Sequence, residues 1–157
     1  MKMTKSAYLP RDFTADFVLA ARLWRRMTRE VTAQYGIAEA GAAPLLWIGR
    51  MGEGVRQTQL ADRIGIEGAS LVRVIDELVA AGLVRRQPDP SDRRANGLYL
   101  TDEGRNIVVR VEEELQALRE RVLGDVDAAD IAAAERIIAA IKSAAGRVPG
   151  RTLELAD

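Results

Sequence analysis

The chain has 157 residues, of which 23 are basic and 23 are acidic, and it contains no cysteine and no histidine. Without cysteine there is no disulfide framework and no thiol-based peroxide switch, and a metal would find only oxygen ligands, which argues against zinc. Acid–base catalysis would fall to carboxylates, lysines and tyrosines, and the sequence has neither a glycine-rich phosphate loop nor a Gly-x-Ser-x-Gly motif. We therefore expect no catalytic residue, no metal and no cofactor, in one domain or one small lobe with dimerising helices.

The charges are distributed unevenly along the chain. Residues 1 to 36 hold seven basic and three acidic residues, whereas residues 102 to 130 hold four arginines and nine carboxylates. Residues 56 to 94 have seven arginines and six carboxylates, so their attraction to a polyanion must come from placement rather than from excess charge. No apolar run could span a bilayer and no signal peptide is evident, so we expect a cytoplasmic protein without a membrane partner.

The N-terminal part predicts two helices. The first runs from about residue 11 to residue 34, and Gly36 stops it from continuing. Its apolar face could contact both a core and a partner chain. The second is expected over residues 39 to 51, although Pro44 suggests a later start, near Ala43. After a turn over residues 52 to 54, Val55 can form a very short strand against the base of a later hairpin.

Residues 55 to 101 predict a short helix, a longer helix and a β-hairpin. Leu60, Ala61 and Ile64 form one apolar stripe on the short helix, which Gly65 can end. The longer helix spans about 67 to 81, and Gly82 can end it in the left-handed conformation. Two helices joined by so short a connection should cross at a steep angle, as in a helix-turn-helix.

The longer helix is the candidate recognition helix. Gly68, Ala69 and Ser70 are small enough for the backbone to approach the floor of a DNA groove, and the N-terminal amides favour phosphate. Arg73 can reach a base edge or a phosphate, or it can simply pair with Glu77 one turn away. Ser70 is equally well interpreted as a plain surface residue.

A hairpin with a charged tip follows over about residues 83 to 101. Turn-forming residues occupy positions 88 to 91 and 95 to 97, and Asp92, Arg93 and Arg94 lie between them. Asp92 can hold the Arg94 guanidinium by a charge-assisted bond, and a held arginine suits the narrow minor groove of DNA. The alternative is that these arginines are ordinary solvated charges of a loop.

Two more helices are expected after the hairpin. Thr101 should cap a helix of about two dozen residues that Gly124 ends, and a last helix should start at Asp127 or Ala128. The apolar faces of these helices and of the first helix are larger than a small lobe can cover. We therefore expect a second copy of the chain to cover them.

The central region resembles the winged helix-turn-helix of the MarR family of bacterial transcriptional regulators, in particular its SlyA-like branch. The matching segments are 59–61 (QLA), 64–66 (IGI), 70–73 (SLVR), 76–78 (DEL), 81–84 (AGLV), 92–95 (DRRA) and 100–104 (LTDEG), with Leu23, Trp24 and Arg25 as a further local match. The resemblance implies a mainly α protein with a winged helix-turn-helix lobe and long N- and C-terminal helices that form a dimerisation region. Its parts would be an arm and dimerisation helix (1–36), the DNA-binding lobe (37–101), C-terminal dimerisation helices (102–148) and a tail (149–157).

The implied function is that of a sequence-specific regulator of transcription, not of an enzyme. A homodimer would bind a pseudo-palindromic operator in double-stranded DNA as a repressor, associated with the nucleoid when bound. The residues expected to contact DNA are Thr58, Gln59, Gly68, Ala69, Ser70, Arg73, Asp92, Arg93 and Arg94. Capping of the short helix is the alternative role for Thr58 and Gln59. A winged-helix module that binds another protein is the alternative to the whole assignment.

The resemblance also implies release from DNA by an effector, a small aromatic carboxylate or a phenol. The cleft would lie between the long helices and the lobe, and its candidate residues are Arg22, Trp24, Arg25, Ala42, Leu46 and Trp47. Arginine can clamp a carboxylate and tryptophan can stack on a ring. Packing in the core is the alternative role of the two tryptophans, and a DNA binder that needs no ligand is the alternative function.

Overall fold

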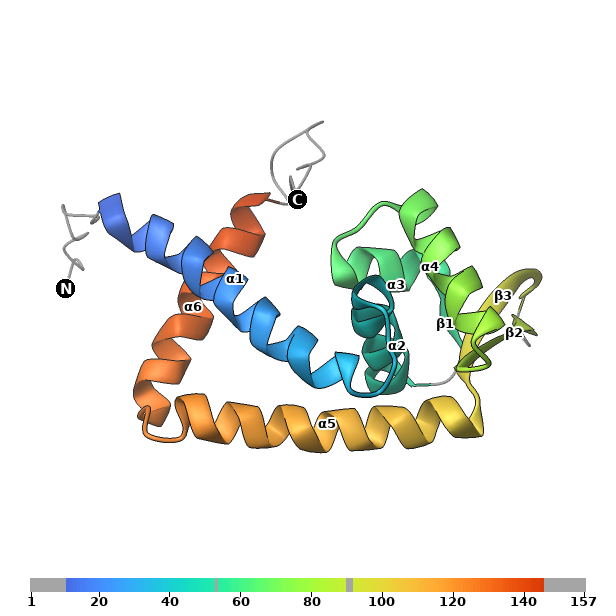
Figure 1. Cartoon of the computed structure of the whole chain (residues 1–157). Coiled ribbons are helices and arrows are strands. Elements are labelled where there is room, and N and C mark those ends of the chain that lie inside the picture. Colours follow the sequence, from blue (N-terminus) through green and yellow to red (C-terminus); the bar gives the residue numbers. More distant parts are fainter. Residues whose placement is uncertain (1–10, 53, 90–91, 146–157) are drawn as a thin grey trace. The chain divides into compact units, whose positions relative to one another are not determined.

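A computed structural model describes residues 11 to 52, 54 to 89 and 92 to 145. Helices dominate these ranges, and the strands form one small antiparallel sheet of order β1-β3-β2 (Figure 1). The elements are α1 (Arg11–Ala33), α2 (Glu39–Met51), β1 (Val55–Arg56), α3 (Gln57–Ile64), α4 (Gly68–Ala80), β2 (Val84–Asp89), β3 (Asp92–Leu100), α5 (Asp102–Leu123) and α6 (Ala128–Ala145). The predicted class, mainly α with a winged helix-turn-helix, is confirmed.

The chain divides into two compact units, Met1–Ala117 and Leu118–Asp157. The first contains the helix-turn-helix of α3 and α4 and the hairpin of β2 and β3, together with α1, α2 and most of α5. The second contains the end of α5 and α6, and no residue of α6 is buried. The functional division predicted at residues 36, 101 and 148 is not tested by this partition and stays a prediction.

The core of the first unit lies between α2, α3, α4 and the sheet. Its most deeply buried side chains, Leu45, Ile48, Leu60, Leu71, Ile75 and Leu98, are at most 1% exposed. The N-terminal half of α5 packs on α2, where a Cβ at Gly49 would lie 2.9 Å from Val108. An ion pair between Arg50 and Glu112 joins the same two helices.

The helix ends follow the sequence signals, with one exception. Gly65 and Gly82 have φ angles of 80° and 72°, the left-handed region that stops a helix, and Thr101 Oγ1 accepts the Gly104 N–H at 2.9 Å. The helix predicted over residues 39 to 51 is confirmed as α2, and only the alternative of a later start near Ala43 is wrong, because the helix begins at Glu39 and contains Pro44. A proline there loses one hydrogen bond near the helix start, and its fully buried ring offsets that loss by apolar packing.

The hairpin is held to the lobe at its base. Val55 pairs with Leu98, which confirms the predicted short strand, and Val84 pairs with Leu100. Val84, Leu98 and Leu100 are all buried, so the apolar face of the hairpin closes the core beside α4. None of the described helices is both long enough and apolar enough to cross a bilayer.

Candidate nucleic-acid interface

One face of α4 belongs to the core and the other is open. Leu71, Val74, Ile75 and Leu78 are buried, whereas Gly68, Ala69, Ser70 and Arg73 are exposed. Glu67 is the N-cap residue but makes no side-chain hydrogen bond to the first amides of the helix. These amides therefore keep their capacity to donate to an anion at the positive end of the helix dipole.

Gly68 is not required by the fold of the chain itself. A Cβ at this position would meet no atom within 4 Å, and the φ angle of Gly68 is not positive. Neither packing nor backbone conformation in the described part of the chain therefore demands a glycine at the first position of α4. The close approach of another molecule is a physical reason for one.

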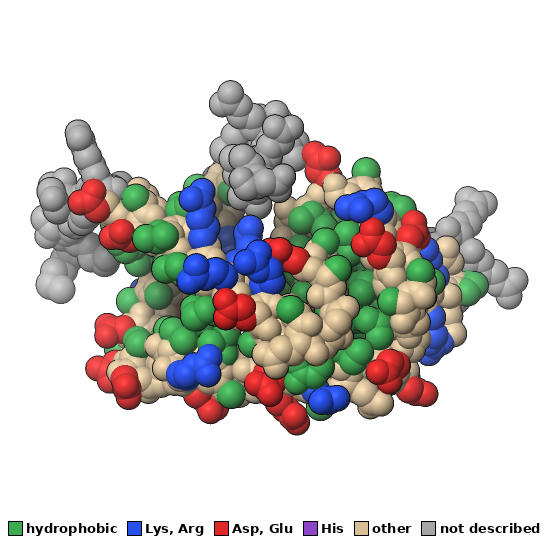
Figure 2. Space-filling view, viewed as in Figure 1, with side chains coloured by type: hydrophobic (Ala, Val, Ile, Leu, Met, Phe, Trp, Pro, Cys, Tyr) green, Lys and Arg blue, Asp and Glu red, His purple; other side chains and the backbone are tan. Residues whose placement is uncertain are grey.

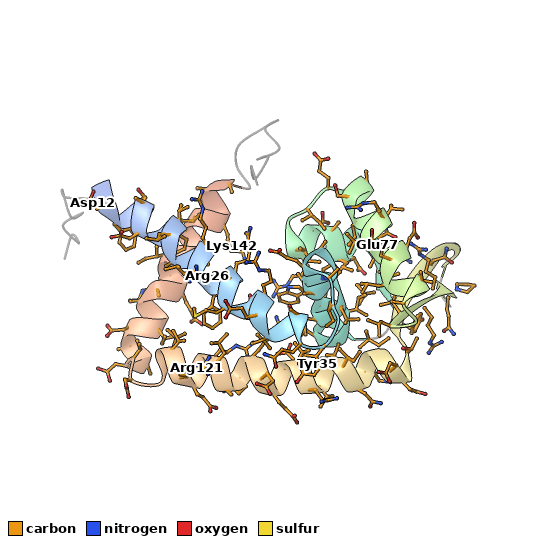
Figure 3. All side chains as sticks on the ribbon, viewed as in Figure 1. Asp12, Arg26, Tyr35, Glu77, Arg121 and Lys142 are labelled. Atoms are coloured by element: carbon orange, nitrogen blue, oxygen red, sulfur yellow. The ribbon has the colours of Figure 1, made fainter. Side chains whose placement is uncertain are left out.

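Arg73 forms an ion pair with Glu77, which Figure 3 labels on α4. Its Nη1 lies 3.0 Å from Glu77 Oε1, and the two side chains are 77% and 51% exposed. Exposed pairs of this spacing contribute only about 0.3–0.5 kcal/mol. Arg73 can therefore leave Glu77 for a base edge or a phosphate at small cost, so the pair does not exclude a role in DNA binding.

Two predicted contacts lie on α3. Thr58 and Gln59 are both exposed at the start of this helix. Gln59 Oε1 accepts the Arg56 N–H at 3.1 Å, which is one half of a capping box and agrees with the capping alternative. The Gln59 amide nitrogen is a donor that can still serve a phosphate.

The hairpin projects from the lobe beside the C-terminal end of α4 (Figure 1). Asp92, Arg93 and Arg94 begin β3, and Asp89 pairs with Asp92 where the two strands meet at the tip. The side chains of these three predicted contacts lie outside the described residues. The predicted bond between Asp92 and Arg94 therefore stays a prediction.

Acidic and basic side chains are mixed over the lobe in the view of Figure 2. This mixture agrees with the balance of seven arginines and six carboxylates in residues 56 to 94. A uniformly basic face would attract any duplex strongly. On a mixed face the affinity for DNA depends on a few well-placed groups.

The candidate effector residues lie on α1 and α2. Arg22 and Arg25 are exposed, Ala42 and Trp24 are half-buried, and Leu46 is 7% exposed. Trp47 is half-buried, as Trp24 is, and the choice between a core role and a ligand role for the two tryptophans stays a prediction. The guanidinium carbons of Arg63 and Arg50 lie 4.0 Å and 5.1 Å from the centre of the Trp47 ring.

Arg63 was not predicted as a partner of Trp47. The two residues belong to α3 and α2, and no local sequence signal links them because their contact depends on how the helices pack. The same is true of Asp76 and Arg86, which belong to α4 and β2 and form an ion pair of 2.6 Å.

The comparisons with known proteins agree on one family. A model of the MarR family matches residues 44–95, from α2 to the hairpin. The transcriptional regulator PA3341 has 27% sequence identity and a TM-score of 0.79, over 87% of this chain and 99% of its own. RV1404 from Mycobacterium tuberculosis has 26% identity and a TM-score of 0.64, over 92% of this chain and 100% of its own.

A third similar structure contains DNA. It is a mutant MarR from E. coli in complex with operator DNA, with 21% identity and a TM-score of 0.72, over 83% of this chain and 94% of its own. At this identity the match supports the fold alone. The SlyA-like branch stays a prediction, but the family model and the two structures above 25% identity, one of them a transcriptional regulator, agree with the winged lobe described here. The family model matches residues 44–95 and the fold is shared with a transcriptional regulator at 27% identity, so the winged lobe is similar to that of the MarR family of transcriptional regulators.

Proposed function

We propose that the chain forms a homodimer that binds a pseudo-palindromic site in double-stranded DNA. One α4 would enter each of two successive major grooves, and each hairpin would reach the flanking minor groove, with half-sites roughly 10 bp apart between centres. The observation that carries this proposal is the exposed N-terminal half of α4, which is small-sided, uncapped by Glu67 and followed by Arg73. The E. coli MarR of the same fold was solved with operator DNA.

In this proposal each predicted contact has one role. Gly68, Ala69 and Ser70 let the start of α4 approach the groove floor, and their amides meet phosphate. Arg73 reads a base edge, and Thr58 and Gln59 donate to phosphates from α3. At the hairpin tip, Asp92 orients Arg94 for the minor groove and Arg93 meets the backbone.

Exposed apolar side chains support the dimer. On α1 and in the second unit, large apolar residues are between 37% and 54% exposed: Phe13, Phe17, Val18, Leu19, Leu23, Val122, Leu123, Val126, Ile137, Ile138 and Ile141. Ile137, Ile138 and Ile141 share one side of α6 by helical periodicity, which is the pattern of a helix that packs on another surface. We propose that a second copy supplies this surface, with residues 1–36 and 102–148 as the dimerisation region.

The dimer would repress transcription by occupying its operator. A small aromatic carboxylate or phenol would release it only by binding more tightly to a state in which the two lobes cannot reach both half-sites. Arg22 and Arg25 offer exposed guanidinium groups for a carboxylate. Arg63 already covers one face of the Trp47 ring, so an aromatic ligand that stacks on that face must displace this arginine.

That covered face of the ring favours a second candidate function, a DNA binder that needs no ligand. A mobility-shift titration with aromatic acids and phenols separates the two, since only the ligand-responsive protein releases its operator.

The test of DNA binding is a titration against the promoter region adjoining its own gene, and a selection from random duplexes. We expect a pseudo-palindrome, and an affinity that falls steeply as salt rises because bound phosphates release counterions. The charge balance of the lobe predicts only modest affinity for unrelated duplexes. A module that binds another protein would show no salt-dependent affinity for DNA.

Replacing Gly68 with alanine should change folding and binding in opposite directions. The Cβ meets no atom of the chain, so the variant should be more stable by about 0.4–1 kcal/mol in denaturant unfolding. Its operator affinity should fall, because the added methyl group holds the start of α4 away from the groove. Unchanged operator affinity in Gly68→Ala would show that the start of α4 is not close to DNA.

Replacing Arg73 with alanine should weaken operator binding by about 1–3 kcal/mol per half-site and relax the preference at one base pair. Glu77→Gln is the matched control, because it breaks the same ion pair and leaves the arginine in place. If Arg73 serves only this ion pair, both variants will bind the operator and its single-base variants as the wild type does.

A further inference from the structure

An ion pair connects the proposed recognition helix to the proposed wing. Arg86 Nη1 on β2 lies 2.6 Å from Asp76 Oδ1 on α4, and the two side chains are 32% and 57% exposed. The distance is that of a charge-assisted hydrogen bond, and the residues are ten positions apart in the sequence. The bond therefore links two elements that would contact different grooves.

Arg86 lies on β2 just beyond the buried base of the hairpin, so a bond at this residue can affect the direction of the hairpin tip. Side chains alternate along a strand, so Arg86 shares its face with Val84, and its register partner is Leu98. Val84 and Leu98 are 2% and 1% exposed, which places Arg86 at the edge of the apolar contact between hairpin and helix. Arg85 lies on the other face, with its guanidinium carbon 5.2 Å from the centre of the Tyr99 ring.

We infer that Asp76 and Arg86 are positioning residues that fix the direction of the wing relative to the recognition helix. This inference rests on the proposed DNA-binding function. From Arg86 the strands continue to the tip at Asp89 and Asp92 without the buried apolar pairs of the hairpin base. A bond at this point sets the direction of the tip before binding, so the complex does not lose that freedom on association.

Asp76 does not fit a simple attraction to phosphate. Asp76 carries a negative charge on the exposed side of the helix that would approach DNA, where a lone carboxylate repels the duplex. Together the two residues are neutral. A partly exposed ion pair also contributes little to folding, so stability is a weak reason for it.

The direction in which Asp76→Asn changes DNA affinity distinguishes a role of Asp76 through its charge alone from a role in holding Arg86. If Asp76 acts only through its charge, Asp76→Asn should tighten DNA binding. If it holds Arg86, the same change should weaken operator binding, by about tenfold, since the wing must then be ordered on binding. Arg86→Gln should weaken binding to a similar degree, with little change in the slope of log affinity against log salt, because Arg86 is not a phosphate contact.

The exchanged pair Asp76→Arg with Arg86→Asp is the rescue. It should recover most of the operator affinity lost in either single variant. In hydroxyl-radical footprinting, the single variants should lose the protection of the DNA flanking each half-site, and the exchanged pair should restore it. Glu39→Gln is the matched control, because it breaks another exposed ion pair between elements, with Arg29 at 3.3 Å. We expect the control to bind as the wild type does, and the thermal unfolding midpoints of the single variants to stay close to that of the wild type.

Four results would overturn the inference. Tighter or unchanged operator binding by Asp76→Asn, or an exchanged pair no better than the single variants, would leave DNA binding intact and remove the positioning role. A salt slope lowered by about one in Arg86→Gln would make Arg86 a direct phosphate contact. A wild-type protein without salt-dependent DNA binding would overturn the proposed function and this inference together.

Discussion

Replacing Arg94 with alanine is expected to weaken operator binding strongly. A minor-groove arginine placed where the potential is most negative contributes about 1–3 kcal/mol, and a dimer uses two of them, so affinity should fall by on the order of 100-fold or more. The measurement is a mobility-shift titration with the selected operator. Dimerisation, followed by light scattering, should not change.

The hairpin gives this arginine its support. Residue 94 lies on β3, whose inner end is anchored by the buried Leu98 and its pairing with Val55. Arg121→Ala is the matched control, because it removes the same charge from the end of α5, in the second unit. Equal operator binding by Arg94→Ala and the wild type would contradict the assignment of the hairpin as a wing.

Local signals were sufficient to predict the elements of the lobe. The 3.6-residue period of Leu71, Ile75 and Leu78 identified the buried side of α4, and Gly65 and Gly82 fixed two helix ends because few other residues adopt positive φ cheaply. The same period showed which residues of α4 are exposed. The bounds predicted for α2 are confirmed, but the later start that Pro44 suggested is wrong, because the sequence does not show that the proline ring is buried in the core.

Contacts between elements could not be predicted in this way. The stack of Arg63 on Trp47 and the bond between Asp76 and Arg86 depend on crossing angles and register, which periodicity does not specify. The sequence offered two roles for Arg73, and the ion pair with Glu77 is compatible with both because it is so exposed. The candidate interface was therefore predicted as a set of exposed residues, and its internal connections were not.

A charge on the apolar side of α6 is expected to separate the proposed dimer and with it to abolish tight operator binding. Ile138 is 43% exposed, beside Ile137 and Ile141 at 38% and 47%. Burial of each isoleucine in a dimer would contribute about 1.5–3 kcal/mol, and an arginine in its place would have to be desolvated without a partner. Ile138→Arg should therefore be a monomer by light scattering.

The loss of DNA binding follows from geometry rather than from damage to the lobe. In a dimer the second half-site is bound at a high effective concentration, which can raise affinity 10²–10⁴-fold, and a monomer keeps only one half-site. Ala132→Arg is the matched control, since it adds the same charge to the same helix on the side away from the isoleucines. A dimeric Ile138→Arg with wild-type affinity would exclude this side of α6 from the interface. A monomeric variant with wild-type affinity would overturn the two-groove arrangement itself, because one recognition helix and one wing would then be sufficient for the operator.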